Sequence, residues 1–143
     1  MAWRWFPLAL AFTAIAGVSG ALAEGQRSPA DKVVNACKNA DTPTQAACLE
    51  RALKGVETGL DEARKKALAT IQGGALAGED LKKTLELFEA GEKAWVSYRS
   101  AQCDAYGLYD KAIGGGGSAA RWTCLINETV YRTSTLKTRF SSE

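Results

Sequence analysis

The sequence predicts a small all-α protein, an antiparallel bundle of about four helices stapled by two disulfides. Its long segments place apolar residues three and four positions apart, which is the spacing of one helix face, and no segment alternates with the period of two that strands need. Most of these segments begin with residues typical of a helix start. The four cysteines of this short chain are an even number, as disulfide pairing requires.

Residues 1–23 have the pattern of a Sec-type secretory signal peptide. Arg4 precedes an apolar run, and Ala21-Leu22-Ala23 has the small residues of a cleavage site. The run is too short for a membrane span, so we expect no stable membrane insertion after cleavage. No cysteine follows the cleavage site, so no lipid anchor is expected. Residues 24–143 should then form one domain in the periplasm or outside the cell.

Two helices are expected in the first half of this domain. Ser28-Pro29 combines a capping serine with a first-turn proline, which predicts a short helix to about Asn39. Thr42-Pro43 repeats the signal and predicts a longer helix to about Ile71. The apolar face of this longer helix is expected to carry Cys48, Ala52, Val56, Leu60, Ala63, Ala67 and Ile71.

The glycine-rich segment 73–78 separates the first half from the second. Gly73 is expected to take the left-handed conformation that ends a helix, and Glu79-Asp80 favours the start of the next. This third helix should end near Tyr106-Gly107. Its inner face is expected to carry Leu81, Leu85, Phe88, Trp95, Tyr98, Arg99 and Gln102.

A loop with the sequence GLYDKAIGGGG should follow, and Ser118 should cap a fourth helix. The packed face of that helix is expected to carry Trp122, Leu125, Ile126, Thr129, Arg132 and Leu136. Because the connections are short, neighbouring helices should be antiparallel.

The positions of the cysteines favour one pairing. In an antiparallel hairpin, residues equidistant from the turn face each other. Cys37 and Cys48 are centred between Thr42 and Pro43, and Cys103 and Cys124 are centred between Ile113 and Gly114. Both midpoints fall in turns predicted from other residues, so we expect Cys37–Cys48 and Cys103–Cys124. A four-thiolate zinc site is the alternative, but it needs closely spaced cysteine pairs that the sequence lacks, so no metal is expected.

The same midpoint places other residues of the third and fourth helices opposite each other. Arg99 falls opposite Glu128, which predicts a salt bridge, and Trp95 falls opposite Arg132, which predicts a guanidinium stacked on the indole. Tyr98 is expected to fill the same seam beside Trp95. These residues are therefore interpreted as a structural seam that Cys103 locks.

Composition excludes several functions. The chain has no histidine, which excludes histidine-assisted nucleophiles and histidine metal sites. Of 18 basic and 16 acidic residues, only Arg4 lies in the signal peptide, so the mature chain has a net charge of +1. A nearly neutral chain is not expected to bind nucleic acid. Glu86 and Glu89 share a helix face, but acids dispersed among lysines indicate a solvated surface, so we expect no catalytic residues, no cofactor and no enzyme activity.

The second half of the chain follows a recognisable order of motifs: a helix with A-W-x-x-Y-R-x-x-x-C, a G-G-S loop, a cysteine, and T-x-x-R with a leucine four residues on. The matching residues are Trp95, Tyr98, Arg99, Cys103, Gly116, Gly117, Ser118, Cys124, Thr129, Arg132 and Leu136. With these motifs the sequence resembles the lysozyme inhibitor LprI-like N-terminal domain family from about Asp31 to Leu136. Cys37, Cys48 and Leu60-Asp61 fit the first half of the family pattern.

The resemblance implies a small exported bacterial helical domain, and some members of the family inhibit lysozyme. A lysozyme cleaves with two carboxylates in a groove, which a projecting loop with donors can block. The candidate loop residues are Lys111, Gly114, Gly115, Gly116, Gly117, Ser118 and Arg121. The glycines allow close backbone approach, and Arg121 is the strongest donor to carboxylates. The alternative is a cell-envelope accessory or structural protein with a different protein partner.

Overall fold

The structure is a computed structural model that describes residues 29–39 and 41–141, so the expected signal peptide lies outside the described residues. Four helices make up the described chain. They are α1 (Pro29–Asn35), α2 (Thr42–Gly73), α3 (Gly78–Ala112) and α4 (Ser118–Arg139). The described residues form no strand, as the absence of any alternating segment predicts. No helix among them has the length and apolar character that crossing a membrane requires.

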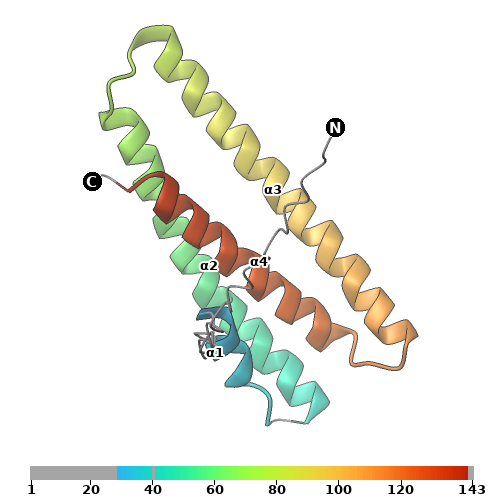
Figure 1. Cartoon of the computed structure of the whole chain (residues 1–143). Helices are drawn as coiled ribbons and strands as arrows, with labels where there is room; N and C mark the ends of the chain where they lie inside the picture. The colour runs from blue at the N-terminus through green and yellow to red at the C-terminus, as the bar shows by residue number, and fades with distance from the viewer. Residues whose placement is uncertain (1–28, 40, 142–143) are drawn as a thin grey trace, which may run out of the picture.

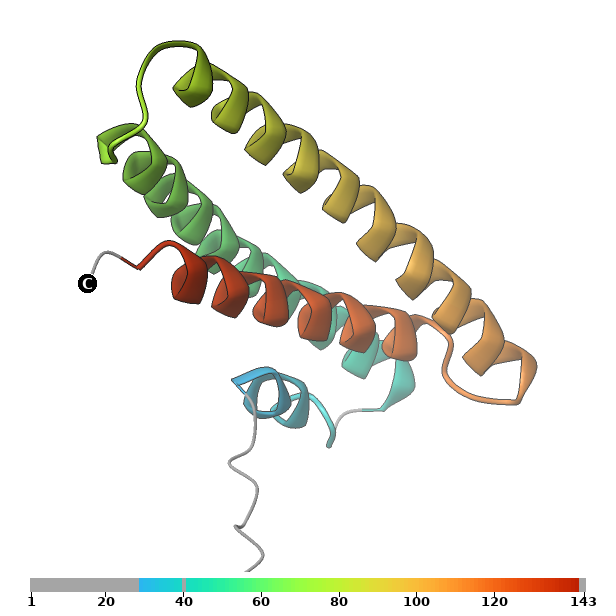
Figure 2. The same cartoon turned by 45° about the horizontal axis from the view of Figure 1, so that its top comes forward.

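The helix α4 is the centre of the arrangement. It runs antiparallel to α3 and packs along both α2 and α3, while α2 and α3 meet directly at few points. The rotated view shows α2 and α3 diverging from their shared turn like the arms of a V, with α4 near the open end (Figure 2). The short α1 lies beside α2 and α4 at that end.

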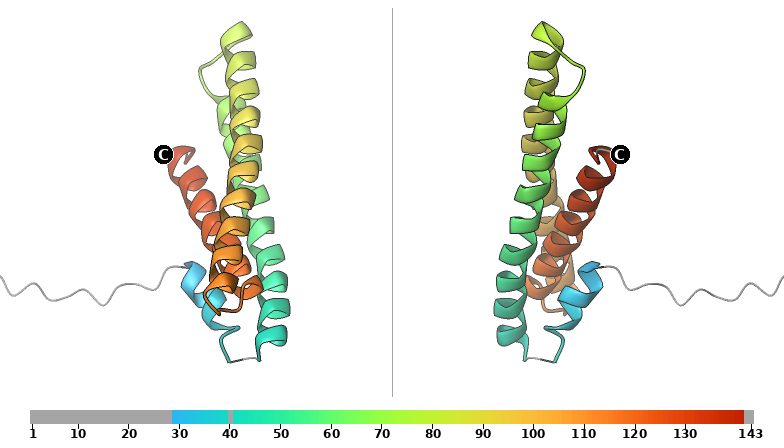
Figure 3. Two further views of the ribbon diagram at one scale, coloured as in Figure 1. Left: turned by 90° about the vertical axis from the view of Figure 1, so that its right-hand side faces the viewer. Right: turned by 90° about the vertical axis from the view of Figure 1, so that its left-hand side faces the viewer.

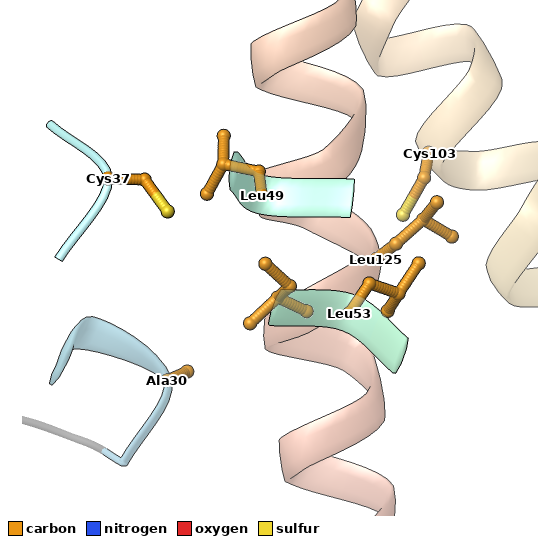
Figure 4. Close-up of a cluster of buried hydrophobic side chains, with 7 residues drawn as sticks. Ala30, Cys37, Leu49, Leu53, Cys103 and Leu125 are labelled. Carbon is orange, nitrogen blue, oxygen red and sulfur yellow. The ribbon is translucent and has the colours of Figure 1, made fainter. Parts of the chain in front are cut away.

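Two apolar clusters form the core. The larger one joins all four helices and includes Leu49, Leu53 and Ile126, which are at most 6 % exposed. Figure 4 shows Leu49 and Leu53 of α2 beside Leu125 of α4. The smaller cluster contains Leu60, Ala63 and Leu136, with Phe88, Trp95 and Phe140 packed against it. The predicted apolar face of α2 is therefore confirmed, although it omitted the deeply buried Leu49 and Leu53.

Both predicted disulfides are present. Cys37 and Cys48 join the turn after α1 to α2, with their Cα atoms 5.7 Å apart. Cys103 and Cys124 join α3 to α4 with a Cα–Cα distance of 5.5 Å. The hairpin geometry used to pair them is thus correct, and the zinc alternative is wrong because all four thiols are consumed in disulfides.

Several predicted helix ends are wrong. The first helix ends at Asn35 rather than Asn39, and residues 36–39 form turns. Gly73 is the last residue of α2 rather than a left-handed cap, and Gly74 after it is extended; the left-handed glycine of this turn is Gly78, with φ 57°. Ser118 is the first residue of α4, which no side-chain hydrogen bond caps.

The largest correction concerns the end of α3. The helix continues past the expected end at Tyr106-Gly107 to Ala112, so that residues 113–117 alone form the loop. Gly107 lies inside the helix because α3 and α4 approach closely there, and a Cβ at this position would lie 2.9 Å from the Cβ of Arg121. The glycine therefore permits helix packing rather than ending the helix.

Candidate functional site

The glycine-rich loop connects α3 and α4 at one end of the molecule, as Figure 1 shows. The disulfide Cys103–Cys124 ties the two helices together below the loop. Gly107 holds their backbones close, and its carbonyl lies 3.4 Å from where a Cβ of Gly117 would be. The loop is thus anchored at its base by a covalent bond and by a close helix contact.

Asp110 organises the loop, a role that the sequence analysis missed. Its side-chain Oδ2 accepts a hydrogen bond of 2.8 Å from the backbone N–H of Gly117. Its backbone carbonyl accepts another of 2.8 Å from the N–H of Gly115. The carboxylate therefore lies at the start of α4, where the partial positive charge of the helix favours an anion.

Two of the loop glycines are sterically required. Gly114 has φ 87° and Gly117 has φ 46°, which are left-handed conformations that other residues rarely adopt. A side chain at Gly115 would also collide with Asp110, because its Cβ would lie 2.4 Å from the Oδ2 atom. The glycines thus allow one specific folded loop, which differs from the flexible turn that a run of glycines suggests.

The predicted loop residues gather around one open groove of about 730 Å³. Its lining includes Lys111 from the last turn of α3 and Ser118 and Arg121 from the first turn of α4, together with Gly115, Gly116 and Gly117. Gly114 lies in the same loop without lining the groove. The structure therefore brings together six of the seven candidate residues at one face of the hairpin end.

The three candidate donors differ in their availability. Arg121 is engaged already, because its Nε donates to Asp104 Oδ1 at 2.5 Å and its guanidinium lies 4.7 Å from the Trp122 ring centroid. Ser118 is exposed and donates to the carbonyl of Gly116 at 3.3 Å. Lys111 is exposed and makes no ion pair within the described chain. Lys111 is thus the most available cation at the groove.

The structural seam is partly as predicted. Trp95 is half-buried, and the guanidinium of Arg132 lies 5.9 Å from its ring centroid, as predicted. Arg99 also stacks on this indole, at 5.1 Å. The prediction that Tyr98 fills the seam is wrong, since Tyr98 is 58 % exposed. Neighbouring side chains of an α-helix point about 100° apart. Arg99 points toward the core, so Tyr98 beside it points toward solvent.

The predicted ion pair between Arg99 and Glu128 is also wrong. Arg99 reaches Glu57 of α2 instead, with an Nη2–Oε1 distance of 3.1 Å, and its Nη1 donates to the Thr129 hydroxyl at 2.7 Å. Glu128 accepts a weaker hydrogen bond of 3.4 Å from Gln102. The prediction considered only the hairpin of α3 and α4. It failed because Arg99 also faces α2, which supplies its partner Glu57.

A buried carboxylate was missed entirely. Glu92 is 1 % exposed, and its Oε1 accepts hydrogen bonds from Nε (2.9 Å) and Nη2 of Arg132. Arg64 of α2 approaches its Oε2 to 3.3 Å. The available signal was its spacing, since Glu92 stands three residues before Trp95 on the inner face of α3. These charges join α2, α3 and α4 and lie apart from the loop groove.

The acids considered as a possible catalytic pair lie on the surface. Glu86 and Glu89 are exposed on α3, and so are Asp61, Glu62 and Asp80. Glu86 forms only a long ion pair with Lys83, at 4.0 Å. These residues are a solvated face, as the sequence predicts.

Comparison with known proteins yields one finding. The family model described as lysozyme inhibitor LprI matches residues 37–136. The matched range begins at the first cysteine and ends at the buried Leu136, so it includes both disulfides and the whole loop. No curated protein and no solved structure matches the chain.

Proposed function

Because the chain belongs to the lysozyme inhibitor LprI family, we propose that it is an exported bacterial binding protein that inhibits a lysozyme through its glycine-rich loop. It acts by occupying a site and performs no catalysis of its own. The two disulfides support export, since such bonds persist in oxidising compartments. The observation that carries the proposal is the fixed shape of the loop at an open end of the helical hairpin.

The loop has the form that blocking a lysozyme groove requires. Residues 113–117 form a narrow loop because four of the five are glycines. The backbone of this loop can therefore approach the active-site groove of a lysozyme with few side chains in the way. Lys111 stands beside the loop and supplies an ammonium group to the acidic residues that such enzymes use for catalysis. Ser118 adds a hydroxyl that donates only a weak bond of 3.3 Å in the free protein.

Apolar side chains around the loop supply contact area. Leu108 is 71 % exposed, Tyr109 is 62 % exposed and Ile113 is 66 % exposed. Aromatic side chains such as that of Tyr109 contribute much of the binding energy of protein interfaces when they become buried, while the charged groups set orientation. Arg121 contributes indirectly, because its pairing with Asp104 braces the first turn of α4 against α3.

The fixed loop also lowers the cost of binding. A loop that must become ordered loses conformational entropy on association. Here the hydrogen bonds from Asp110 and the disulfide below the loop impose the shape beforehand. Less of the binding energy of the contacts is therefore lost to ordering the loop, and more of it contributes to affinity.

A turbidity assay with bacterial cell walls tests the proposal. Mature, oxidised protein is titrated against lysozymes of several structural classes. We expect one class to be inhibited at near-stoichiometric protein, and Lys111→Glu to weaken inhibition about tenfold or more. The matched control is Lys54→Glu, because Lys54 is also exposed but lies on α2 and does not line the loop groove.

Two results would contradict the proposal. One is the absence of inhibition with every lysozyme class, which would leave a cell-envelope accessory protein with another partner. The other is inhibition that Lys111→Glu and Lys54→Glu reduce equally, since the contact surface would then lie away from the loop.

A further inference from the structure

The helix α3 carries a second stripe of residues that no other part of the described chain covers. Its members follow the alternating spacing of three and four residues that is typical of helices that pack on one another. The first half of the stripe is Leu87, Gly91, Ala94 and Tyr98, and the second half is Ala101, Ala105, Leu108 and Ala112. We call these eight positions the outer seam. All eight are exposed. Figure 3 (left) shows α3 with no other helix in front of it.

The outer seam carries no charge although its helix is highly charged. Twelve of the 35 residues of α3 are charged, so eight uncharged positions in one stripe are not the composition of an ordinary solvated face. Even the buried face of the same helix carries more charge, because it holds Glu92 and Arg99. The outer seam is thus less charged than the buried face, although the remaining exposed positions of α3 hold most of the charges of the helix, and an uncharged exposed stripe indicates contact with another surface.

The sizes of the side chains show which partner fits. If a second α3 runs antiparallel about the midpoint between Arg99 and Ser100, the eight positions pair completely with one another. Leu87 then faces Ala112 of the second copy, Leu108 faces Gly91, Tyr98 faces Ala101, and Ala94 faces Ala105. Every large side chain meets a small one, so the two helices interlock at close distance.

The charges that border the outer seam agree with this register. Lys93 and Asp104 flank the same side of the seam in opposite halves of the helix. Antiparallel pairing brings Lys93 of one copy within one helical turn of Asp104 of the other, twice by symmetry. Both side chains are exposed in the single chain, and no two like charges meet. Asp104 already accepts a hydrogen bond from Arg121 Nε on Oδ1, and its side chain remains 53 % exposed for contact with Lys93.

We infer that the outer seam is the interface of a symmetric homodimer in which two α3 helices pair antiparallel. A two-fold interface must be self-complementary, and the pairing of large with small residues about one midpoint satisfies that condition. The seam spans 26 residues, or about 39 Å at 1.5 Å per residue. The two glycine-rich loops lie at opposite ends of this dimer, and residues 113–117 lie outside the seam. Leu108, which lines the loop groove, is buried in the dimer, so the proposed lysozyme contact of a dimer rests on Tyr109, Ile113 and the loop itself.

Sedimentation equilibrium of the mature, oxidised chain tests the inference directly. We expect a reversible monomer–dimer equilibrium between about 10 µM and 1 mM. Ala101→Lys places a charge at the centre of the seam in a residue with high helix propensity, so we expect a monomer. Ala69→Lys makes the same change at an exposed alanine of α2 and should leave the dimer unchanged.

A zero-length carbodiimide crosslink on the unaltered protein tests the register. Within one chain Lys93 and Asp104 lie eleven residues apart on one straight helix, about 16 Å, which this reagent does not span. We expect the crosslinked dimer to contain Lys93 joined to Asp104. A chain that stays monomeric at about 1 mM, or a dimer that Ala101→Lys does not disrupt, would overturn the inference.

Discussion

Individual charged residues decide how the helices of this protein are oriented. Glu92 is buried between Arg64 and Arg132, and Arg99 is buried between Glu57 and Thr129. Each of these groups joins helices that the apolar contacts alone would allow to slide. Such a network specifies one arrangement because a shifted helix would leave a charge buried without its partner.

Replacing Glu92 with alanine should be strongly destabilising. The change leaves Arg132 and Arg64 facing each other without the carboxylate, and loss of one partner of a buried ion pair costs about 3–5 kcal/mol. Urea unfolding followed by circular dichroism measures the effect. Glu89→Ala is the matched control, because Glu89 lies three residues earlier on the exposed surface, where substitutions change stability by at most about 0.5 kcal/mol.

A loss of under about 1 kcal/mol in Glu92→Ala would show that the carboxylate is dispensable and that the apolar clusters alone set the helix arrangement.

The sequence could not single out Glu92 as a buried residue, because glutamate side chains are usually exposed. Hairpin geometry identified the stacking of Arg132 on Trp95 correctly, because both residues lie in one two-helix hairpin.

At the scale of the helices, the close approach of α3 and α4 decides which features of their hairpin could be predicted from the sequence. Hairpin geometry located Cys103–Cys124 from the sequence because a disulfide concerns only two helices. It failed for Arg99, whose partner Glu57 belongs to a third helix. It also failed for the end of α3, because Gly107 was interpreted as a breaker when it is a packing contact.

A methyl group at Gly107 should separate the two helices. Its Cβ would lie 2.9 Å from the Cβ of Arg121 and 3.0 Å from the Gly117 carbonyl, so the backbone must shift. We expect Gly107→Ala to lower the free energy of unfolding by about 1–3 kcal/mol. Gly55→Ala should instead raise it by about 1 kcal/mol, because Gly55 is helical with open space around it. Equal effects of the two substitutions, measured by thermal unfolding, would contradict close packing at Gly107.

The disulfide below the loop should stabilise the fold and the loop together. Cys103→Ser combined with Cys124→Ser removes a cross-link between residues with a sequence separation of 21, which lowers stability by about 3 kcal/mol. Chemical denaturation of the variant and of the oxidised protein measures the difference. A variant as stable as the oxidised protein would show that Gly107 and the Asp110 hydrogen bonds already fix the hairpin end.

For the whole molecule, the sequence predicts the fold class well and the surroundings of the candidate loop only in outline. Apolar periodicity and cysteine positions suffice for four helices and two disulfides, because both are properties of local spacing. The shape of the loop could not be predicted from the sequence, because it depends on a hydrogen bond from the backbone N–H of Gly117 to the Asp110 carboxylate across the hairpin end. The candidate residues nevertheless line one groove, because Lys111, Ser118 and Arg121 flank the same short loop.

Amide hydrogen exchange of the oxidised protein, with and without lysozymes of several structural classes, tests the proposed loop contact most directly. We expect an added lysozyme to slow exchange at the amides of residues 113–118, and Asp110→Ala to weaken this protection because the loop loses the bond to Gly117. Protection confined to α1 and α2, with unchanged exchange in the loop, would contradict it.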